Sequence, residues 1–483
     1  MLTRVSEKRL GFQPLACKRD MRRPELNRDS GWLIGVDLLV VFLGLIGQVF
    51  LSRSLLSTDY GLLIILLDAF ATIFILIDAG LPTLLNRDGP KAPGMARTAA
   101  HRILKLQAII ALPFIIIAFI GSTIIWGDLP ISLLSICAAI TLMHVASYPH
   151  RSLLRCLGEA RLEAVTKLLE RTVTTCLYGC LMVFEVNEIQ WWALAFFIGA
   201  MLGLISAVIF GERVGKSNQG EGVLPELWNS NKTLLMGALP FAVTLGVLPY
   251  VTKLEKFLLS YYHSYEDVAL FHVAQLAWLA GLLVPQGVRA ALLPVLGEAR
   301  TQEQVIARMS KAQLLGFILL PLGLFFGHIL VSNLIPLAFS TNYVQAVEIF
   351  DILLAGWALT LLAVPWYVGL QAGPHPWRFT GLLGLVVLSA FVSGIILIPQ
   401  YGVTGAAWAS VCGSFVMFYA SRWMNRTKLP QQIWLDISAL TCLVTGYFLS
   451  TGSRWAWIGL ITMIPASLSI AEIRHQMKIS EEE

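Results

Sequence analysis

The sequence predicts an all-α integral membrane protein with about fourteen transmembrane helices. Its 483 residues are 56% hydrophobic and only 13% charged, whereas a soluble domain carries about 25% charged residues. Apolar stretches of about twenty residues recur along almost the whole chain, and this length crosses a hydrocarbon core about 30 Å thick. The basic residues cluster between these stretches, which leaves no room for a soluble domain of useful size.

The apolar segments fall into two sets of six and a final pair. The first set lies at residues 31–52, 60–85, 103–126, 130–150, 167–186 and 191–210. The second set lies at residues 234–258, 268–291, 312–332, 348–371, 378–398 and 403–423, and the final pair at 432–450 and 455–472. We therefore expect a cytoplasmic basic tail (1–30), an N-terminal six-helix bundle (31–210), a cytoplasmic linker (211–232), a C-terminal six-helix bundle (233–425), an additional helix pair (426–473) and a second cytoplasmic tail (474–483).

The distribution of Lys and Arg predicts the orientation. If the amino terminus is cytoplasmic, 31 of the 35 basic residues fall in inner segments, as the positive-inside rule requires. The exceptions are Arg53, Lys253, Lys256 and Arg454. We therefore expect a multi-pass protein of the cell membrane with both termini in the cytoplasm and only short outer loops.

Some partners and sites are not expected. The net charge of +5 could indicate nucleic acid, but the basic residues form no polar stripe with interleaved aromatics. The cysteines lack the paired spacing of metal ligands. We therefore predict no nucleic-acid partner, no metal and no cofactor.

Two similar acidic turns indicate that one six-helix unit is used twice in the same orientation. One turn contains Asp59, after the first apolar segment, and the other contains Asp267, after the seventh. Aligning these aspartates also places Asp78 near Gln286, each before small residues late in the following segment. Parallel repeats of this kind build several kinds of transporter.

Several short motifs resemble one family. They are Ser57-Thr58-Asp59-Tyr60-Gly61, Asp78-Ala79-Gly80-Leu81 followed by Arg87, residues 253–261 and residues 399–409. In their order and spacing across residues 31–425 they resemble the polysaccharide (O-antigen type) flippases of the multidrug/oligosaccharidyl-lipid/polysaccharide (MOP) exporter superfamily. An aspartate is usual in that family where Glu255 stands here.

The resemblance implies a MATE-like arrangement, in which two six-helix bundles face each other across a central cavity that opens alternately to the two sides. It also implies a cargo, an oligosaccharide linked to polyprenyl pyrophosphate, which moves from the inner to the outer leaflet during polysaccharide biosynthesis. The partners it implies are this lipid-linked cargo, membrane lipids, H⁺ or Na⁺, and the polysaccharide polymerase and glycosyltransferases.

Four acidic residues in the predicted helices are candidates for coupling transport to an ion gradient. Asp68 lies deepest, and Asp78, Glu255 and Asp37 complete the set. An ionisable group inside a span costs at least about 2.5 kcal/mol and usually faces a cavity. The alternative for Asp68 is a hydrogen bond between helices, and for Asp78 and Asp37 it is a place at the inner interface.

Four cations are candidates for binding the pyrophosphate, namely Lys253, Lys256, Arg289 and Arg87. Lys253 and Lys256 depart from the inside bias and, three residues apart, share one helix face, while Glu255 points elsewhere. Lysine binds phosphate as a point charge, which suits a site that must also release its cargo. The alternatives are that both lysines extend to the outer headgroups and that both arginines only follow the positive-inside rule.

Two other functions are open. An ion-coupled antiporter of drugs or small molecules, with the same fold, would need an acid-rich cavity for cations, whereas the charged residues here are mixed and slightly basic. A membrane glycosyltransferase or polymerase would need carboxylates or histidines on a substantial loop, and the outer loops are too short. We therefore predict a flippase and not an enzyme.

Overall fold

The computed structural model describes residues 26–452, except for residues 128, 219, 221–222, 248–249, 300, 374–375, 428 and 430–431. Within this part the regular structure is entirely helical. The first half contains α1 (Leu26–Ser54), α2 (Ser57–Asp78), α3 (Leu81–Asp88), α4 (Pro93–Trp126), α5 (Ile131–Cys156), α6 (Ala160–Val183) and α7 (Ile189–Ser217). The second half contains α8 (Asn231–Val247), α9 (Tyr250–Tyr262), α10 (Tyr265–Gly281), α11 (Leu283–Gly297), α12 (Gln302–Phe339), α13 (Ala346–Ala372), α14 (Pro376–Asn425) and α15 (Gln432–Ser450).

These helices cover thirteen of the fourteen predicted segments, and the last one, residues 455–472, lies outside the described residues. Nine of the described helical runs are long and apolar enough to cross a membrane, and the pair α8 and α9, which meets at 52°, makes a tenth. This confirms the predicted all-α, multi-pass membrane fold. The short helices η1 (Gly89–Lys91), η2 (Glu226–Asn229) and η3 (Thr341–Tyr343) lie between the long ones.

Two predicted segments, 60–85 and 234–258, are each divided between two helices in the structure. The segment 60–85 is broken between α2 and α3, because Ala79 (φ 49°) and Gly80 (φ 69°) adopt left-handed conformations that end a helix. A Cβ at Gly80 would also lie 2.7 Å from the Cβ of Phe241 in α8. The run labelled α14 contains two helices that meet at Gly402 (φ 55°), as predicted for the separate segments 378–398 and 403–423.

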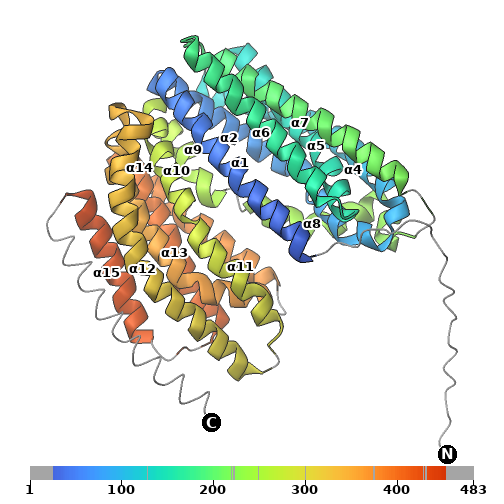
Figure 1. The fold of residues 1–483 in the computed structure, drawn as a ribbon. Helices are drawn as coiled ribbons and strands as arrows, with labels where there is room; N and C mark the ends of the chain where they lie inside the picture. The colour runs from blue at the N-terminus through green and yellow to red at the C-terminus, as the bar shows by residue number, and fades with distance from the viewer. Residues whose placement is uncertain are drawn as a thin grey trace, which may run out of the picture.

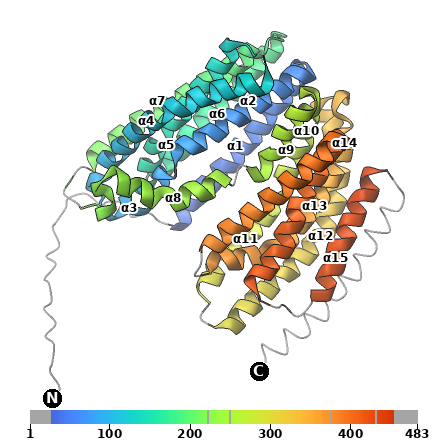
Figure 2. The ribbon, with the colours of Figure 1, turned by 180° about the vertical axis from the view of Figure 1, so that it is seen from behind.

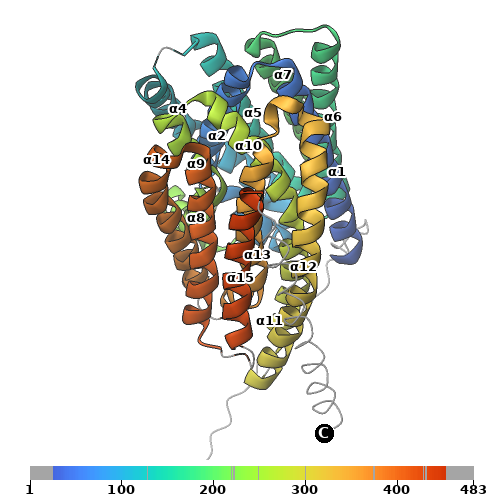
Figure 3. The same cartoon turned by 90° about the vertical axis from the view of Figure 1, so that its left-hand side faces the viewer.

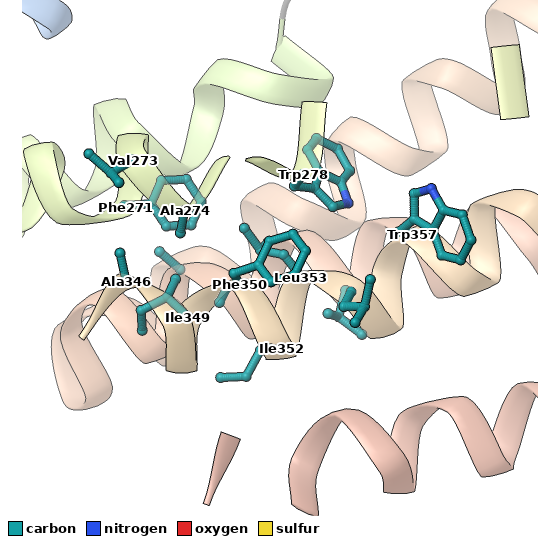
Figure 4. Packing of buried hydrophobic residues seen from close by; sticks show 14 of the residues in the cluster. Phe271, Val273, Ala274, Trp278, Ala346, Ile349, Phe350, Ile352, Leu353 and Trp357 are labelled. Atoms are coloured by element: carbon teal, nitrogen blue, oxygen red, sulfur yellow. The ribbon is translucent and has the colours of Figure 1, made fainter. Parts of the chain in front are cut away.

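Helices α1–α7 form the first bundle and α9–α14 form the second. Helix α13 is the centre of the second bundle, where it packs against α10, α11, α12 and α14 and most of its residues are buried. Figure 4 shows Phe271 and Trp278 of α10 facing Phe350 and Trp357 of α13. The Trp357 indole also donates a hydrogen bond of 2.8 Å to the Gly281 carbonyl. This large apolar core makes the second bundle a unit on which side chains can be positioned.

The two bundles meet at one end and diverge at the other (Figures 1 and 2). They meet at the α9–α10 turn, where α10 packs along α2. A Cβ on Gly61 of α2 would lie only 1.7 Å from the Tyr265 carbonyl oxygen of α10, so this approach requires glycine. This end carries the loops that we predict to be outside the cell. We call the contact between α1, α2 and α4 of the first bundle and α9, α10 and α12 of the second the outer seam.

Two helices lie at the edges of this arrangement. Helix α8 packs against α2, α3 and η2 of the first half and also touches α14 of the second bundle. Helix α15 runs along α13 on the flank of the second bundle (Figure 3). The predicted boundaries between the bundles, the linker and the final helix pair, and the central cavity itself, stay predictions.

Candidate functional site

A buried ion-pair cluster joins the two bundles at the outer seam. Asp68 of α2 lies 3.0 Å from the Lys253 ammonium of α9 through Oδ1, and its Oδ2 contacts Lys256. The side chains are 18%, 19% and 5% exposed, respectively. Asp68 lies eleven residues after the first residue of α2, which at 1.5 Å per residue corresponds to about 16 Å along the helix axis. The cluster therefore lies about three turns from the end of α2, and both ammonium groups contact the Asp68 carboxylate.

A chain of neutral polar groups continues from this cluster. The Lys256 ammonium lies 3.5 Å from Nδ1 of His272 in α10, and Nε2 of His272 lies 3.4 Å from Oε1 of Gln48 in α1. An ammonium only donates, so Nδ1 accepts and Nε2–H donates to the amide oxygen. The Tyr60 hydroxyl also donates to this oxygen, at 2.8 Å. The chain crosses the seam a second time, from α10 to α1.

Glu255 lies beside these lysines but faces the other way. It is 1% exposed, and the Ser410 side chain of α14 lies beside it. Neither carboxylate oxygen has a partner with hydrogen-bond geometry in the described residues. An ionised carboxylate without a partner is very costly in an apolar environment. Glu255 is therefore the acid of the site that is best suited to bind a proton or a cation.

The other two predicted acids lie nearer the inner end of the first bundle. Asp78, 3% exposed, ends α2 and accepts a hydrogen bond of 3.3 Å from Gln107. Asp37 of α1 lies 3.0 Å from the Lys167 ammonium of α6, and its side chain is 55% exposed. Neither carboxylate is part of the cluster around Asp68.

The two predicted arginines also lie apart from the lysines. Arg289 is about 12 Å from the end of α11 at 1.5 Å per residue. It donates to Gln371 at 3.1 Å and to Gln286 at 2.9 Å. Within the described part of the chain, no salt bridge is found for Arg289. Arg87, by contrast, pairs with Asp88 at 2.8 Å and is 47% exposed.

Asp88 is the centre of a second charged cluster, at the predicted inner surface. Its side chain is 1% exposed and accepts hydrogen bonds from Arg87, from Lys91 at 3.0 Å and from the Trp228 indole of η2 at 3.1 Å. Burial raises the pKa of Asp88, but its three donors outweigh burial and hold the pKa at about 2. This cluster fastens η2, within the linker, to the first bundle.

Sequence reasoning missed several of these residues. His272 and Gln48 carry no charge signal, and Asp88 was passed over because Arg87 was considered alone. A third cluster was also missed, in which Glu170 of α6 pairs with Arg151 at 2.5 Å and His144 at 2.9 Å, both of α5. An adjacent Arg-Asp pair and an acid in a predicted span were signals that could have found Asp88 and Glu170.

A cavity of about 360 Å³ lies at the inner ends of α11–α14. Gly369, Arg378, Asn425 and Thr427 are among the residues that line it. None of the eight predicted site residues lines this cavity, so it is separate from the cluster at the outer seam.

Comparison with known proteins identifies the family. Residues 26–300 match the family described as polysaccharide biosynthesis protein, which is more than half of the chain. The chain belongs to this polysaccharide biosynthesis protein family. The matched region contains α1–α11 and therefore the whole cluster around Asp68. No curated protein sequence matches the chain significantly.

Several solved structures have folds similar to that of this protein. The lipid II flippase MurJ in an inward closed conformation is similar with a TM-score of 0.67 and 13% identity, over 92% of this chain and 99% of that chain. An inward-facing multidrug resistance MATE transporter of the MOP superfamily has a TM-score of 0.64 and 15% identity, over 80% and 94%. A MOP superfamily transporter from Pyrococcus furiosus has a TM-score of 0.57 and 14% identity, over 86% and 94%. This polysaccharide biosynthesis protein therefore has the MOP fold.

The Asp88 cluster predicts how the linker is held. Asp88→Asn removes the charged acceptor of three donors, so we expect several-fold faster trypsin cleavage after Lys216 or Lys232 in membrane vesicles, measured by mass spectrometry. Glu226→Gln, which changes an exposed acid of η2, is the control and should leave the rate unchanged. Equal rates for Asp88→Asn and the native protein would contradict this role.

The same cluster gives a pH dependence. The folded pKa of about 2 lies below the ordinary value of about 4. The stabilisation is therefore complete above about pH 4 and is lost as the pH falls toward about 2. Protease protection of the linker should accordingly stay constant between about pH 5 and pH 8.

Proposed function

We propose that this protein is a flippase that carries a polyprenyl-pyrophosphate-linked oligosaccharide from the inner to the outer leaflet of the cell membrane by alternating access. The observation that carries the proposal is the position of Lys253 and Lys256, two cations held inside the membrane where the bundles meet. In a polysaccharide biosynthesis protein, the anionic link of a lipid-bound sugar is a cargo that these cations fit.

The cargo poses a specific physical problem. Its sugar and its pyrophosphate are polar, so they must cross inside the protein, while the polyprenyl tail stays in the bilayer. A water-filled space between the bundles would accept the headgroup, and fixed cations would replace part of the water around the pyrophosphate. Rocking of one bundle against the other then changes the leaflet to which the headgroup is exposed.

The four predicted cations take different parts in this proposal. Arg87, half exposed at the predicted inner surface, attracts anionic headgroups to that side. Arg289 lies deeper, bonded to two glutamines, and its charge is available to the pyrophosphate. Lys253 and Lys256 lie deepest and receive the pyrophosphate before its release on the outer side.

Ion coupling belongs to the acids that have no cationic partner. Asp68 and Asp37 each pair with lysine, so their negative charges are already neutralised. Neither Glu255 oxygen has a partner with hydrogen-bond geometry among the described residues, and the donors to Asp78 are amides, the Gln107 side chain and the Gly80 backbone. Binding of H⁺ or Na⁺ to Glu255 or Asp78 would remove an uncompensated buried charge and favour one state of the transporter over the other.

The family also bears on the partners and on the main alternative. A flippase of this kind acts after glycosyltransferases and before a polymerase in the assembly of a polysaccharide, with its two termini in the cytoplasm. A drug antiporter of the same fold would place acids where cationic drugs bind. Here the deepest acid, Asp68, is already held by two lysines, which favours an anionic cargo.

Replacing Lys253 and Lys256 together by Gln should abolish headgroup turnover, because the cargo loses its two cations. We expect a decrease of about tenfold or more, measured as the accessibility of a fluorescent lipid-linked sugar in reconstituted vesicles. The control Lys105→Gln/Lys232→Gln removes two exposed cations and should retain native turnover. Adding Asp68→Asn to the double variant leaves no unpaired charge and guards against misfolding. Normal turnover by the correctly folded triple variant would rule out the site.

Glu255→Gln should separate turnover from its driving ion. The neutral amide mimics a protonated acid, so we expect transport that no longer responds to an imposed pH gradient or, if the ion is sodium, to a Na⁺ gradient. The same vesicle assay with and without each gradient measures this response. Glu266→Gln, at the exposed outer turn, is the control. A full gradient response in Glu255→Gln would assign coupling to another residue.

A further inference from the structure

We propose that Asp68 is an internal competitor of the cargo. Its carboxylate holds Lys253 and Lys256 while the outer seam is closed, and a headgroup with at least two negative charges releases them and lets the seam open. This inference rests on the proposed function. It adds a residue that determines cargo specificity and the step by which the cargo opens its own exit.

Both ammonium groups already contact a carboxylate in this state. Lys253 and Lys256 contact the same carboxylate, one oxygen each, and their side chains are 19% and 5% exposed. The remaining neighbour of Lys256 is Nδ1 of His272. A pyrophosphate therefore reaches both ammonium groups only if Asp68 withdraws.

Asp68 and the two lysines belong to different bundles. Asp68 is on α2, and both lysines are on α9. Withdrawal of Asp68 consequently separates α2 from α9 at the outer seam. Cargo binding and seam opening each require that the ion pair between Asp68 and the lysines is broken. The two equilibria are therefore linked, and each favours the other by the same factor.

The positive and negative charges of the cluster do not balance. Two ammonium groups share one carboxylate, and Glu255 faces away from them toward α14. The closed cluster therefore carries an excess positive charge in a membrane interior, where uncompensated charge is costly. A diphosphate ester has enough negative charge to neutralise both cations. A singly charged phosphodiester only replaces the one negative charge of Asp68, and a neutral lipid provides no charge.

Movement of Lys256 would also affect the other contacts of the outer seam. Lys256 contacts His272, and His272 bonds Gln48 of the first bundle. One turn further along α9, the Ser260 hydroxyl accepts a hydrogen bond of 3.1 Å from the Trp126 indole of α4. Displacement of α9 by cargo therefore breaks the bond between Ser260 and Trp126 and removes the neighbour of His272, whose bond to Gln48 also joins the bundles.

Ser260 offers a way to detect opening from outside. It is 8% exposed at the seam, and Ser260→Cys is a small change. The rate of its modification by a membrane-impermeant maleimide added on the outer side of intact cells or oriented vesicles reports the open fraction of the seam. The native protein, which lacks Ser260→Cys, measures the background labelling of the native cysteines.

The first set of variants tests the hold of Asp68 on the seam. In the Ser260→Cys background, Asp68→Asn should raise the labelling rate several-fold, whereas Asp68→Glu keeps the charge and should stay near the native rate. The matched control is Asp59→Asn, the same change at the outer turn of α2. A native elution profile shows that the Asp68→Asn protein is folded. If Ser260→Cys is then labelled as slowly in this protein as in the native background, the proposal is overturned.

The second set tests competition with an anionic headgroup, using short-chain probes added to the native protein carrying Ser260→Cys. Farnesyl diphosphate should raise the labelling rate, a singly charged farnesyl phosphodiester should raise it much less, and farnesol should have no effect. The Asp68→Asn protein should already label rapidly, with little further response. Equal effects of farnesol and farnesyl diphosphate overturn the proposal.

Different results would contradict the flippase function and the competitor role of Asp68. If lipid-linked pyrophosphates are flipped but Asp68→Asn leaves the seam closed, the competitor role is wrong and the flippase stands. If Asp68→Asn opens the seam but pyrophosphate lipids neither open it nor are flipped, both the proposed cargo and the competition with it are wrong.

Discussion

The contact between one carboxylate and two ammonium groups inside the membrane is the constraint on which the arrangement depends. Asp68, Lys253 and Lys256 are each costly in hydrocarbon, and they are satisfied together only when α2 of the first bundle touches α9 of the second. Because unpaired buried charges are costly, this ion pair holds the two bundles together at one end. Any state that parts them there must provide new negative charge to the lysines and new partners to the aspartate.

The remainder of the fold supports this joint without adding charge to it. Gly61 allows the backbones of α2 and α10 to approach closely, and the aromatic core between α10 and α13 fixes the second bundle as a unit (Figure 4). At the other end the bundles diverge (Figure 2), while Asp88 and Trp228 fasten the linker to the first bundle. The polar contacts of the Asp68 cluster therefore restrain the bundles at the outer end, while at the other end α8 touches both halves.

Local sequence signals predicted the helices well and the site only in part. The length and apolarity of each segment predict a span because the bilayer requires both. The break after Asp78 falls where Ala79 and Gly80 both adopt left-handed conformations, which only the glycine adopts without steric cost. The lysines were conspicuous because they depart from the charge bias of an outward half. Their partner was not predictable, because Asp68 and Lys253 are 185 residues apart and helical periodicity does not specify which faces of two bundles meet. Gln48 and His272 were missed for the same reason.

The central claim is that the ion pair keeps the outer seam closed until an anionic cargo replaces its carboxylate. Spin labels at two exposed outer positions, Leu56 of the first bundle and Tyr261 of the second, would measure the separation directly by pulsed electron paramagnetic resonance in lipid nanodiscs. The account predicts one short distance for the native protein and a second, longer population on adding a polyprenyl diphosphate. An unchanged distance distribution with bound diphosphate would contradict it.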